Sequence, residues 1–470
     1  MNMTAKMKKL TTIGAAALAA GQVLLARAAT EKTWTDSNGV TWNFSSVNST
    51  AHTLTLGSGL NTTTQNAMTP GSVESVDAAT IPWTFTDEND IDWTVTAIGP
   101  NAFRAATNLL HGVLTIPQAV KSIGQLAFGV TTWGDQTAPK IERIASLGGI
   151  TSIALAAFHQ SGSRSNPCPL AGTPFPDISK ITYFDYRSNF EYTLMRGTPT
   201  INKSVTSLPE RLFGLTMIDG AMLIPSSVTS VGGLVFNDCE ELPGAWIAGV
   251  PDVSSGTQTY TAVDPNNLFR YNFLNEMVVL GSNTAPKSGA ALTGQWQFFA
   301  RDVAGGGLVL LPDNGKWDGF ALLNGSTYAN VVFYGFAMSL DEDAGVVNVT
   351  ATNATSLVQA LTYAPKFKSV FGYSTRISVP EFISLSGSGI TQALVDAANA
   401  QYDSLKFSVK TQAELDAVFA AIPSTAPIAI DPAGATETIA IDTTGRSVYV
   451  LLPEGGEYQI KKNGFIIIFN

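Results

Sequence analysis

A short pattern of apolar and polar positions recurs through the middle of the chain. The segment VTAIGPNAF, residues 95–103, has apolar residues at its first, fourth and last positions and ends in phenylalanine. Four further segments repeat it: VKSIGQLAF (120–128), ITSIALAAF (150–158), VTSLPERLF (205–213) and VTSVGGLVF (228–236). Weaker copies end at Phe269 and Phe299, and a degenerate unit is expected around residues 181–194, inside the 55-residue step from Phe158 to Phe213.

A second phrase of alternating apolar residues precedes several of these segments. It reads Leu114–Pro117, Leu223–Pro225 and Leu308–Pro312. Each copy predicts a short strand that the proline ends, because proline has no amide hydrogen to donate. A turn then leads to the nine-residue segment, where three glycines fit a position that needs positive φ or a close backbone approach: Gly99, Gly124 and Gly232.

Repeats of this length predict a stacked architecture. One unit of about 25 residues cannot bury its apolar face alone, whereas stacked neighbours bury a continuous core. We expect the strands to align as a parallel sheet along one curved face and the recurring rings to form an internal stack. The predicted stack residues are Phe103, Phe128, Phe158, Phe213, Phe236, Phe269 and Phe299.

These units resemble BspA-type leucine-rich repeats, whose pattern has the form L-x-x-V-x-I-P-x-x-V-T-S-I-G-x-x-A-F-x-x-C. The best copy is MLIPSSVTSVGGLVFNDCEEL, residues 222–242, and the resemblance extends over about residues 30–320. It implies a leucine-rich-repeat solenoid in a secreted or surface-exposed bacterial protein, often adhesive and not enzymatic. The chain departs from the pattern in having the cysteine only once, at Cys239, and in its uneven spacing.

The flanks differ in character from the repeats. Residues 29–94 alternate aromatic and polar positions, as in WTDSNGVTWNF, and are expected to form a β-rich N-terminal cap on a solenoid over residues 95–344. Residues 345–470 predict a smaller α+β module with helices at Ser356–Tyr363, at Thr391–Gln401 and after a capping box at Thr411–Glu414. The fold class is therefore mainly β with some α.

The first 28 residues read as a secretory signal peptide. A basic stretch at Lys6–Lys9 precedes an uncharged segment, Leu10–Leu25, and Ala26–Ala28 offers small residues for cleavage. A membrane anchor is the weaker alternative, because glycines break a segment that is already short for spanning. No later apolar run approaches membrane length. The expected location is secreted or at the cell surface.

Charge excludes one class of partner. Only 14% of residues are charged and the net charge is −10, which becomes −14 after cleavage, with 23 basic and 37 acidic residues. Nucleic acid is excluded because phosphate contacts need clustered Lys and Arg. Export would permit a disulfide between Cys168 and Cys239, but the sequence leaves that pairing open.

No catalytic, cofactor or metal site is predicted. The three histidines, His52, His111 and His159, are not at metalloprotease spacing, and the last two are expected in turns or at the surface. The acidic clusters at 87–92 and 341–343 admit calcium, but solvated turns are favoured because neither fits an EF-hand loop. A sugar-stacking role is open for the tryptophans, with core positions favoured for Trp42, Trp83 and Trp93.

The sequence therefore predicts a binding protein, with adhesion to a protein or glycan at a cell surface as the leading hypothesis. Binding would be spread over exposed Ser, Thr and Asn positions of the repeats. A structural subunit of a surface layer or matrix, attached through residues 345–470, is the alternative, followed by an enzyme hidden in that module. The ligand and the oligomeric state stay open.

Overall fold

The computed structural model describes most of the chain from residue 32 onward. The described residues are 32–58, 66–104, 106, 109–130, 138–160, 167–251, 258–264, 268–269, 276–287, 307–317, 330–351, 353–379, 382–384, 390–402, 404–409, 411, 413, 428–430, 438–441, 447–451, 457–460 and 466–469. The signal segment, Phe299 and most of the helix expected after Thr411 lie outside the described residues.

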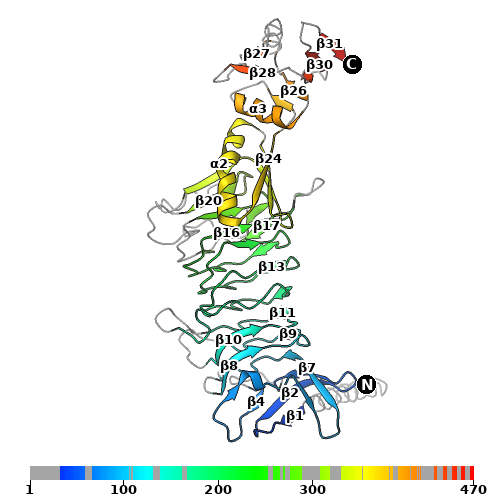
Figure 1. Cartoon of the computed structure of the whole chain (residues 1–470), viewed down its shortest axis with the longest axis vertical. Coiled ribbons are helices and arrows are strands. Elements are labelled where there is room, and N and C mark those ends of the chain that lie inside the picture. Colours follow the sequence, from blue (N-terminus) through cyan, green and yellow to red (C-terminus); the bar gives the residue numbers. More distant parts are fainter. Residues whose placement is uncertain are drawn as a thin grey trace, which may run out of the picture.

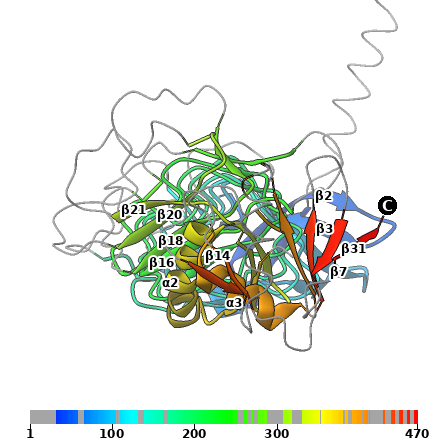
Figure 2. The same ribbon diagram turned by 90° about the horizontal axis from the view of Figure 1, so that it is seen from above.

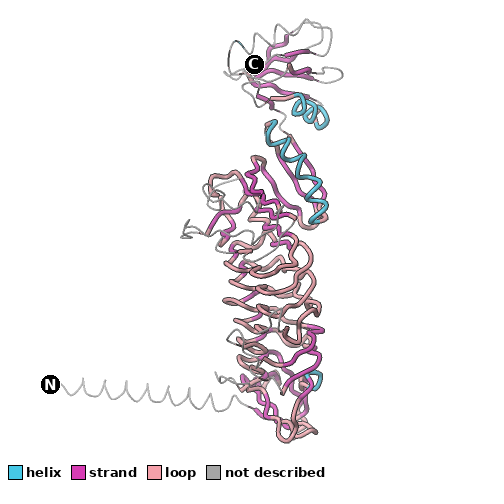
Figure 3. Tube along the Cα trace, turned by 90° about the vertical axis from the view of Figure 1, so that its left-hand side faces the viewer, coloured by secondary structure: helices cyan, strands magenta, loops and turns pink. Residues whose placement is uncertain are grey.

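The chain advances from strands at one end of an elongated molecule to strands at the other (Figures 1 and 3). Several sheets make up most of this length, and the described α-helices are α2 (Ala354–Phe371) and α3 (Gln392–Gln401). The predicted mainly-β class with few helices is confirmed, and the described strands form several sheets with parallel pairing. The two helices correspond to the predicted segments 356–363 and 391–401. Helix α2 extends beyond the predicted end at residue 363 to Phe371.

Two-residue strands from the V-T-S-I-G phrase form one column of parallel pairs. The order runs β7 (Asp92–Ile98), β9 (Ser122–Ile123), β11 (Ser152–Ile153) and β12 (Tyr183–Phe184), and after an isolated bridge from Arg187 to Glu210 it continues as β13 (Ser207–Leu208), β15 (Ser230–Val231), β17 (Thr261–Val263) and β19 (Thr284–Pro286). Each repeat therefore hydrogen-bonds to the next one in register.

The L-x-I-P phrase builds a second column, so the expectation of one curved sheet is wrong. This column comprises β5 (Val76–Asp77), β8 (Leu110–Thr115) and β10 (Lys140–Ser146), then isolated bridges at Pro174, Arg196 and Met217, then β14 (Met222–Ile224), β16 (Gly244–Ile247), β18 (Met277–Leu280), β20 (Leu308–Pro312) and β21 (Asn330–Tyr334). Seen along the stack, β16, β18, β20 and β21 gather on one side (Figure 2). Apolar and polar residues alternate within each of the two phrases of a repeat, so each phrase forms its own strand. Apolar residues from both strand columns pack in one core.

The recurring phenylalanines lie in a continuous ring stack inside this core. The rings of Phe103, Phe128, Phe158, Phe190, Phe213, Phe236 and Phe269 are buried and follow one another at centroid distances of 5.1, 5.3, 5.5, 6.3, 6.0 and 5.4 Å, with interplanar angles between 4° and 17°. Phe190 fills the long step in the sequence and comes from the degenerate unit. At the widest gap, Phe175 packs edge-on against both flanking rings, Phe190 and Phe213.

A backbone ladder accompanies the rings. The amide of Phe103 donates to the carbonyl of Ala127 (2.7 Å), and that of Phe128 donates to Ala157 (2.8 Å), one repeat further on. The turn before each ring needs a left-handed residue, two positions ahead of the phenylalanine: Asn101, Leu126, Ala156, Ser188, Arg211 and Leu234, with φ between 52° and 60°. In each layer where this position is described, a non-glycine residue holds this costly conformation, so stacking must compensate for it.

The glycines of the repeated segment serve close approach instead of positive φ. Gly99, Gly124 and Gly232 all have ordinary φ values. A Cβ added at Gly124 would lie 2.5 Å from the carbonyl carbon of Gly99 and from the nitrogen of Pro100. The backbones of adjacent repeats therefore touch at this position, which leaves no space for a side chain.

Two copies of one β-hairpin open the described chain. In the first, β1 (Lys32–Thr35) pairs with β2 (Thr41–Asn48), and in the second, β6 (Thr84–Thr86) pairs with β7 in the equivalent register. Asp36 accepts hydrogen bonds from two turn amides and from the Trp42 indole, and Asp87 does the same for its own turn and Trp93. The strands β3 (Thr53–Leu56) and β4 (Met68–Thr69) complete this sheet, which is continuous with the first repeat column.

Asp87 is thus a structural turn residue whose carboxylate is already saturated with donors. Lys32 binds it at 2.8 Å, and this ammonium together with the Trp93 indole holds the pKa of Asp87 well below its usual range. Its side chain is buried, in contrast to the solvated turn favoured from the sequence. Residues 35–38 and 86–89 share the sequence T-D-x-N, which accounts for the same turn geometry in the two hairpins.

The chain after residue 336 packs onto the last repeats. Strands β22 (Ala337–Asp341), β23 (Val346–Thr350) and β24 (Ser374–Ser378) form one sheet, and α2 connects the parallel pair β23 and β24. Trp246 of β16 anchors this unit, with its ring 5.1 Å from Phe367 and 5.3 Å from Phe371. The expected module boundary at 344–345 falls in the turn between β22 and β23.

The acidic cluster at 341–343 holds the same unit to the repeats. Glu342 is buried and accepts a hydrogen bond from the Ser226 amide at 2.6 Å, while Lys203 binds Asp343 at 2.5 Å. Asp341 and Asp343 have the exposure expected of a solvated turn, whereas the Glu342 side chain does not.

Beyond this sheet, a separate hydrophobic cluster joins α3 to the final strands. The final strands are β25 (Phe382–Ser384), β26 (Ser404–Ser408), β27 (Ile428–Ile430), β28 (Ile439–Ile441), β29 (Ser447–Leu451), β30 (Glu457–Ile460) and β31 (Ile466–Phe469), of which β25, β26, β28 and β29 contribute side chains to the cluster. The parallel strands β25 and β26, with α3 between them in sequence, repeat the strand–helix–strand order of β23, α2 and β24.

Replacing a stacked ring tests the role of the core column. Phe128→Ala is expected to lower the free energy of unfolding by about 3–5 kcal/mol, because it removes a buried ring that contacts rings on both sides. Tyr183→Ala is the matched control: it deletes an exposed ring, so a change within about 0.5 kcal/mol is expected. Denaturant unfolding measures both, and equal midpoints would contradict the stack.

Adding a methyl group tests the close approach of the backbones. Gly124→Ala is expected to destabilise the protein by about 1–3 kcal/mol, because rigid backbone atoms occupy the space that its Cβ needs. At Gly335 the nearest atom to an added Cβ is the Gln359 Oε1 at 4.0 Å, so Gly335→Ala serves as control. Thermal unfolding of the two variants compares them directly, and an unchanged Gly124→Ala protein would refute the contact.

Candidate functional site

The outward side of the first strand column carries a row of small side chains, serine and alanine. The third position of each repeated segment faces outward and carries Ala97, Ser122, Ser152, Ser207, Ser230, Ala262 and Ala285. Threonines at the preceding position lock neighbouring repeats together: the hydroxyl of Thr151 donates to the Lys121 carbonyl and that of Thr182 to the Thr151 carbonyl. These hydrogen bonds hold neighbouring repeats in a fixed register along this surface.

Two tyrosines interrupt this surface at the degenerate unit. Tyr183 occupies the position that is Ser or Ala in the other repeats and is 58% exposed, and Tyr186 is 67% exposed. Among the described residues they are the exposed aromatic side chains. Asp185 accepts a hydrogen bond from the Tyr183 hydroxyl at 3.2 Å, and the Arg187 guanidinium lies 5.4 Å from the Tyr186 ring centroid. We call these four residues, 183 and 185–187, the aromatic patch.

The local sequence explains why the rings project here. The segment ITYFDYRSNF, residues 181–190, has one residue more than the nine-residue repeat. The backbone accommodates it with two left-handed residues, Tyr186 (φ 54°) and Ser188 (φ 60°), before Phe190 rejoins the stack. The sequence indicated a degenerate unit but not these tyrosines as contacts. An aromatic residue where every aligned repeat has a small one was the available signal.

The patch has the chemistry of a recognition surface. Tyrosine rings combine a large apolar face with a hydroxyl and two rotatable bonds, so they bind partners at a low entropic cost. Asp185 raises the pKa of the Tyr183 hydroxyl by its negative charge and by accepting its hydrogen bond. A hydroxyl held protonated, a carboxylate and a guanidinium thus surround two exposed rings.

A buried polar cluster lies on the layers beneath the patch. His159 was expected in a turn or at the surface, but it is 7% exposed and this expectation is wrong for its side chain. Its Nε2 lies 3.5 Å from the buried Glu191 carboxylate, and Arg211 approaches the other oxygen of Glu191 at 3.4 Å. His159 and Glu191 each follow a stacked phenylalanine, so the stacking of repeats brings them together.

Burial governs the protonation of this cluster. Removal from water lowers the pKa of His159 to about 4 and raises the pKa of Glu191. The imidazole is therefore neutral at neutral pH. It packs edge-on against Tyr192, with 5.3 Å between the ring centroids.

The remaining candidate residues have structural positions. His52 packs against Trp93 at 5.5 Å, and His111 lies in β8. Trp42 and Trp93 are buried and Trp83 packs against the core. Cys168 and Cys239 are both free thiols, so the disulfide that the sequence left open does not form. Each donates to a backbone carbonyl, and burial raises the pKa of Cys168 to about 11.

The described residues show neither a metal-binding cluster nor a membrane-spanning helix. In that part of the chain no group of three or more His, Cys, Asp or Glu side chains is arranged to hold a metal ion. Among the same residues no helix has the length and apolar character needed to cross a membrane.

Comparison with known proteins finds similarity to solved leucine-rich-repeat structures. No family model matches the sequence, and no curated protein matches it. A leucine-rich cell surface protein from Faecalibacterium prausnitzii is 16% identical, with 65% of this chain and 95% of that chain covered and a TM-score of 0.32. A leucine-rich repeat protein from Bacteroides capillosus is 18% identical (43% and 96% covered, TM-score 0.20), and the pneumococcal vaccine antigen PcpA is 13% identical (65% and 99% covered, TM-score 0.25).

The buried histidine predicts a pH-dependent stability. Its pKa is about 4 in the folded chain and near 6.5 when unfolded, so the unfolded state takes up the proton first as the pH falls. The contribution of His159 to stability is complete above pH 6.5 and is lost between pH 6.5 and 4, by about 3 kcal/mol in total.

Urea unfolding of wild type and His159→Gln across this range measures the effect. The wild type is expected to lose more stability on acidification than the variant, since Glu191 is common to both proteins. Parallel curves for the two proteins would show that His159 is not buried as a neutral group.

Proposed function

We propose that this chain is an exported cell-surface binding protein that recognises a protein or glycan through its repeats. In this proposal residues 1–28 direct export, residues 29–94 cap a leucine-rich-repeat solenoid over 95–344, and residues 345–470 form a C-terminal module. Binding, not catalysis, is the proposed activity. The signal-like N-terminus and the repeat phrases of the sequence support the export and family assignments.

The aromatic patch is the observation that carries this proposal. Energetic hot spots of binding surfaces are enriched in Tyr, Trp and Arg, and their neighbours exclude water while adding little energy. Tyr183, Tyr186 and Arg187 stand on a rigid surface of Ser, Ala and Thr that matches this composition. The small side chains around the rings and the repeated strands beside them favour a partner that is itself extended, such as a protein surface or a glycan chain.

Both partner classes suit the two rings. Tyrosine faces pack on the C–H faces of sugars and on apolar side chains alike, and the Asp185 and Arg187 charges orient either partner. The net charge of −10 favours neutral or basic partners over nucleic acid.

Loss of the rings is expected to abolish recognition. The double variant Tyr183→Ala/Tyr186→Ala should bind at least about tenfold more weakly to the ligands that the wild type selects on a glycan and matrix-protein array. The matched control is Val358→Ala/Leu361→Ala, which removes the other large apolar side chains that are exposed among the described residues, 57% and 55% exposed on α2.

Unchanged binding by the tyrosine variant, or equal loss by the control, would contradict the assigned surface.

Fractionation of the native protein addresses the structural-subunit alternative. A large ordered assembly with no free monomer would replace the proposed adhesin with a subunit of a surface layer or matrix.

A further inference from the structure

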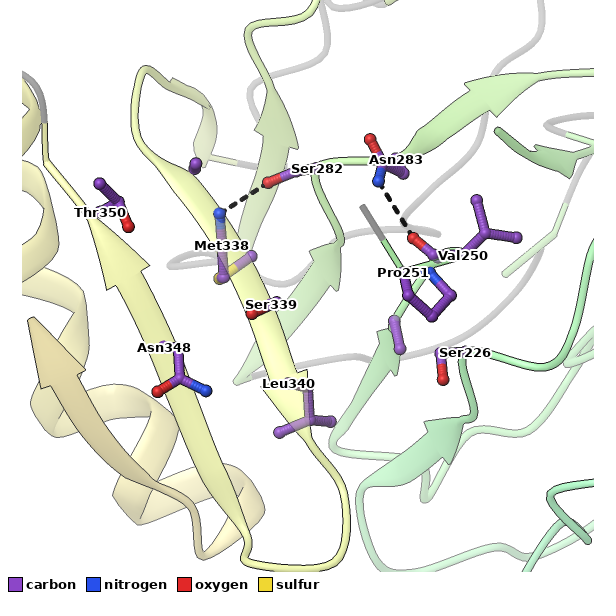
Figure 4. A pocket seen from close by; sticks show the side chains of 13 residues that line it. Ser226, Val250, Pro251, Ser282, Asn283, Met338, Ser339, Leu340, Asn348 and Thr350 are labelled. Atoms are coloured by element: carbon purple, nitrogen blue, oxygen red, sulfur yellow. Dashed lines mark hydrogen bonds between the residues drawn. The ribbon is translucent and has the colours of Figure 1, made fainter. Parts of the chain in front are cut away.

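A pocket with a volume of about 370 Å³ lies where the β22–β23 hairpin meets the turns of the repeats (Figure 4). The repeats contribute the turns that follow β14, β16 and β18: Ser226, residues 248–251, and Ser282 with Asn283. The hairpin contributes residues 337–340, Asn348 and Thr350. The pocket is therefore built at the carboxyl ends of three adjacent parallel strands, far along the chain from the aromatic patch.

Hydrogen bonds fix the two walls against each other. The Met338 amide donates to the Ser282 hydroxyl at 2.8 Å, beside one end of the pocket. At the hairpin turn, Glu342 accepts from the Ser226 amide, and Lys203 binds Asp343. The pocket is preformed in this arrangement, so a ligand would not have to order it.

The lining is polar but carries no ionisable side chain among the residues that form it. The Asn283 carboxamide donates to the Val250 carbonyl at 3.1 Å, which leaves its own oxygen as an acceptor. The side chains of Ser226, Ser339 and Asn348 make no hydrogen bond to another described residue. Ser339 and Asn348 are direct cross-strand partners in the hairpin, so their polar groups lie next to each other.

We propose that this pocket binds a neutral saccharide of one or two rings. A charged ligand would lose its hydration without gaining a counter-charge, and an apolar ligand would leave the amide and hydroxyl groups unpaired. A sugar satisfies these groups with its hydroxyls and places its C–H faces on Pro251 and Leu340. The volume is near the lower end of small-molecule sites, which fits a compact ligand.

Saturation-transfer NMR on the full chain tests this proposal with glucose, galactose, mannose, N-acetylglucosamine and their disaccharides. We expect transfer to at least one of these neutral sugars and none to glucuronic or sialic acid. No transfer to any neutral sugar, or a preference for the acidic ones, would overturn the assignment. Binding of an uncharged peptide in competition at the same residues would also overturn it.

Variants of the two facing side chains locate the binding. Ser339→Phe should fill the pocket and Asn348→Ala should remove a carboxamide, and each is expected to weaken the sugar at least tenfold. Ser207→Phe introduces the same ring on an exposed strand of another repeat and should leave binding unchanged. Thermal unfolding checks that Asn348→Ala remains folded, and full sugar binding by Ser339→Phe would refute the site.

The proposals for the pocket and for the aromatic patch can be tested independently of each other. The Tyr183→Ala/Tyr186→Ala protein should keep its sugar signal, and Ser339→Phe should keep its binding to the array ligands. A sugar signal that disappears with the tyrosines would assign the saccharide to the aromatic patch and not to the pocket.

Discussion

The phenylalanine stack and its backbone ladder fix the distance between successive repeats. Neighbouring strands lie about 4.7–4.9 Å apart in a sheet, whereas the ring centroids are 5.1–6.3 Å apart. The nearly parallel rings must therefore be offset, which is the favourable geometry for aromatic stacking. Each layer then requires the same set of features: a buried ring, a left-handed residue two positions before it, and a backbone that passes close to its neighbour. Only side chains that point outward escape this requirement and can vary for function.

The degenerate unit shows how the stack tolerates an insertion. Its extra residue would shift every later side chain if the ladder continued through it, but Ser188 restores the left-handed turn and Phe190 restores the ring. The surplus backbone is displaced outward and takes Tyr186 with it. A wider gap after Phe190 remains, and Phe175 closes it from the side. The one irregular layer is thus also the layer whose surface differs most from the others, which links the structural departure to the proposed recognition site.

The sequence predicted what depends on period and missed what depends on stacking. Phe128 and Phe236 were assigned to the core because both occupy the last position of the repeated nine-residue segment, and equivalent positions of a repeat have equivalent environments. His159 was misjudged because its burial comes from Glu191 and Tyr192, residues of the next layer whose register was hidden by the insertion. The second strand column was missed because both phrases of a repeat alternate in the same way, and period alone does not say on which side of the core each lies. The glycine at position 124 was placed correctly, and of its two possible reasons only contact with the previous repeat holds.

The elements that follow the repeats pack against a face of the second strand column, and their contact with the repeats also creates a site. Trp246 receives the aromatic face of α2 while Glu342 and Met338 attach the β22–β23 hairpin to the turns beyond β14 and β18. Those turns carry polar groups because the parallel strands end there, and a hairpin with its own polar face cannot pack against them without leaving space. A pocket of neutral hydroxyl and amide groups follows from joining two such surfaces. The pocket forms without any repeat departing from its pattern. The residues that line it can therefore change without disturbing the phenylalanine stack.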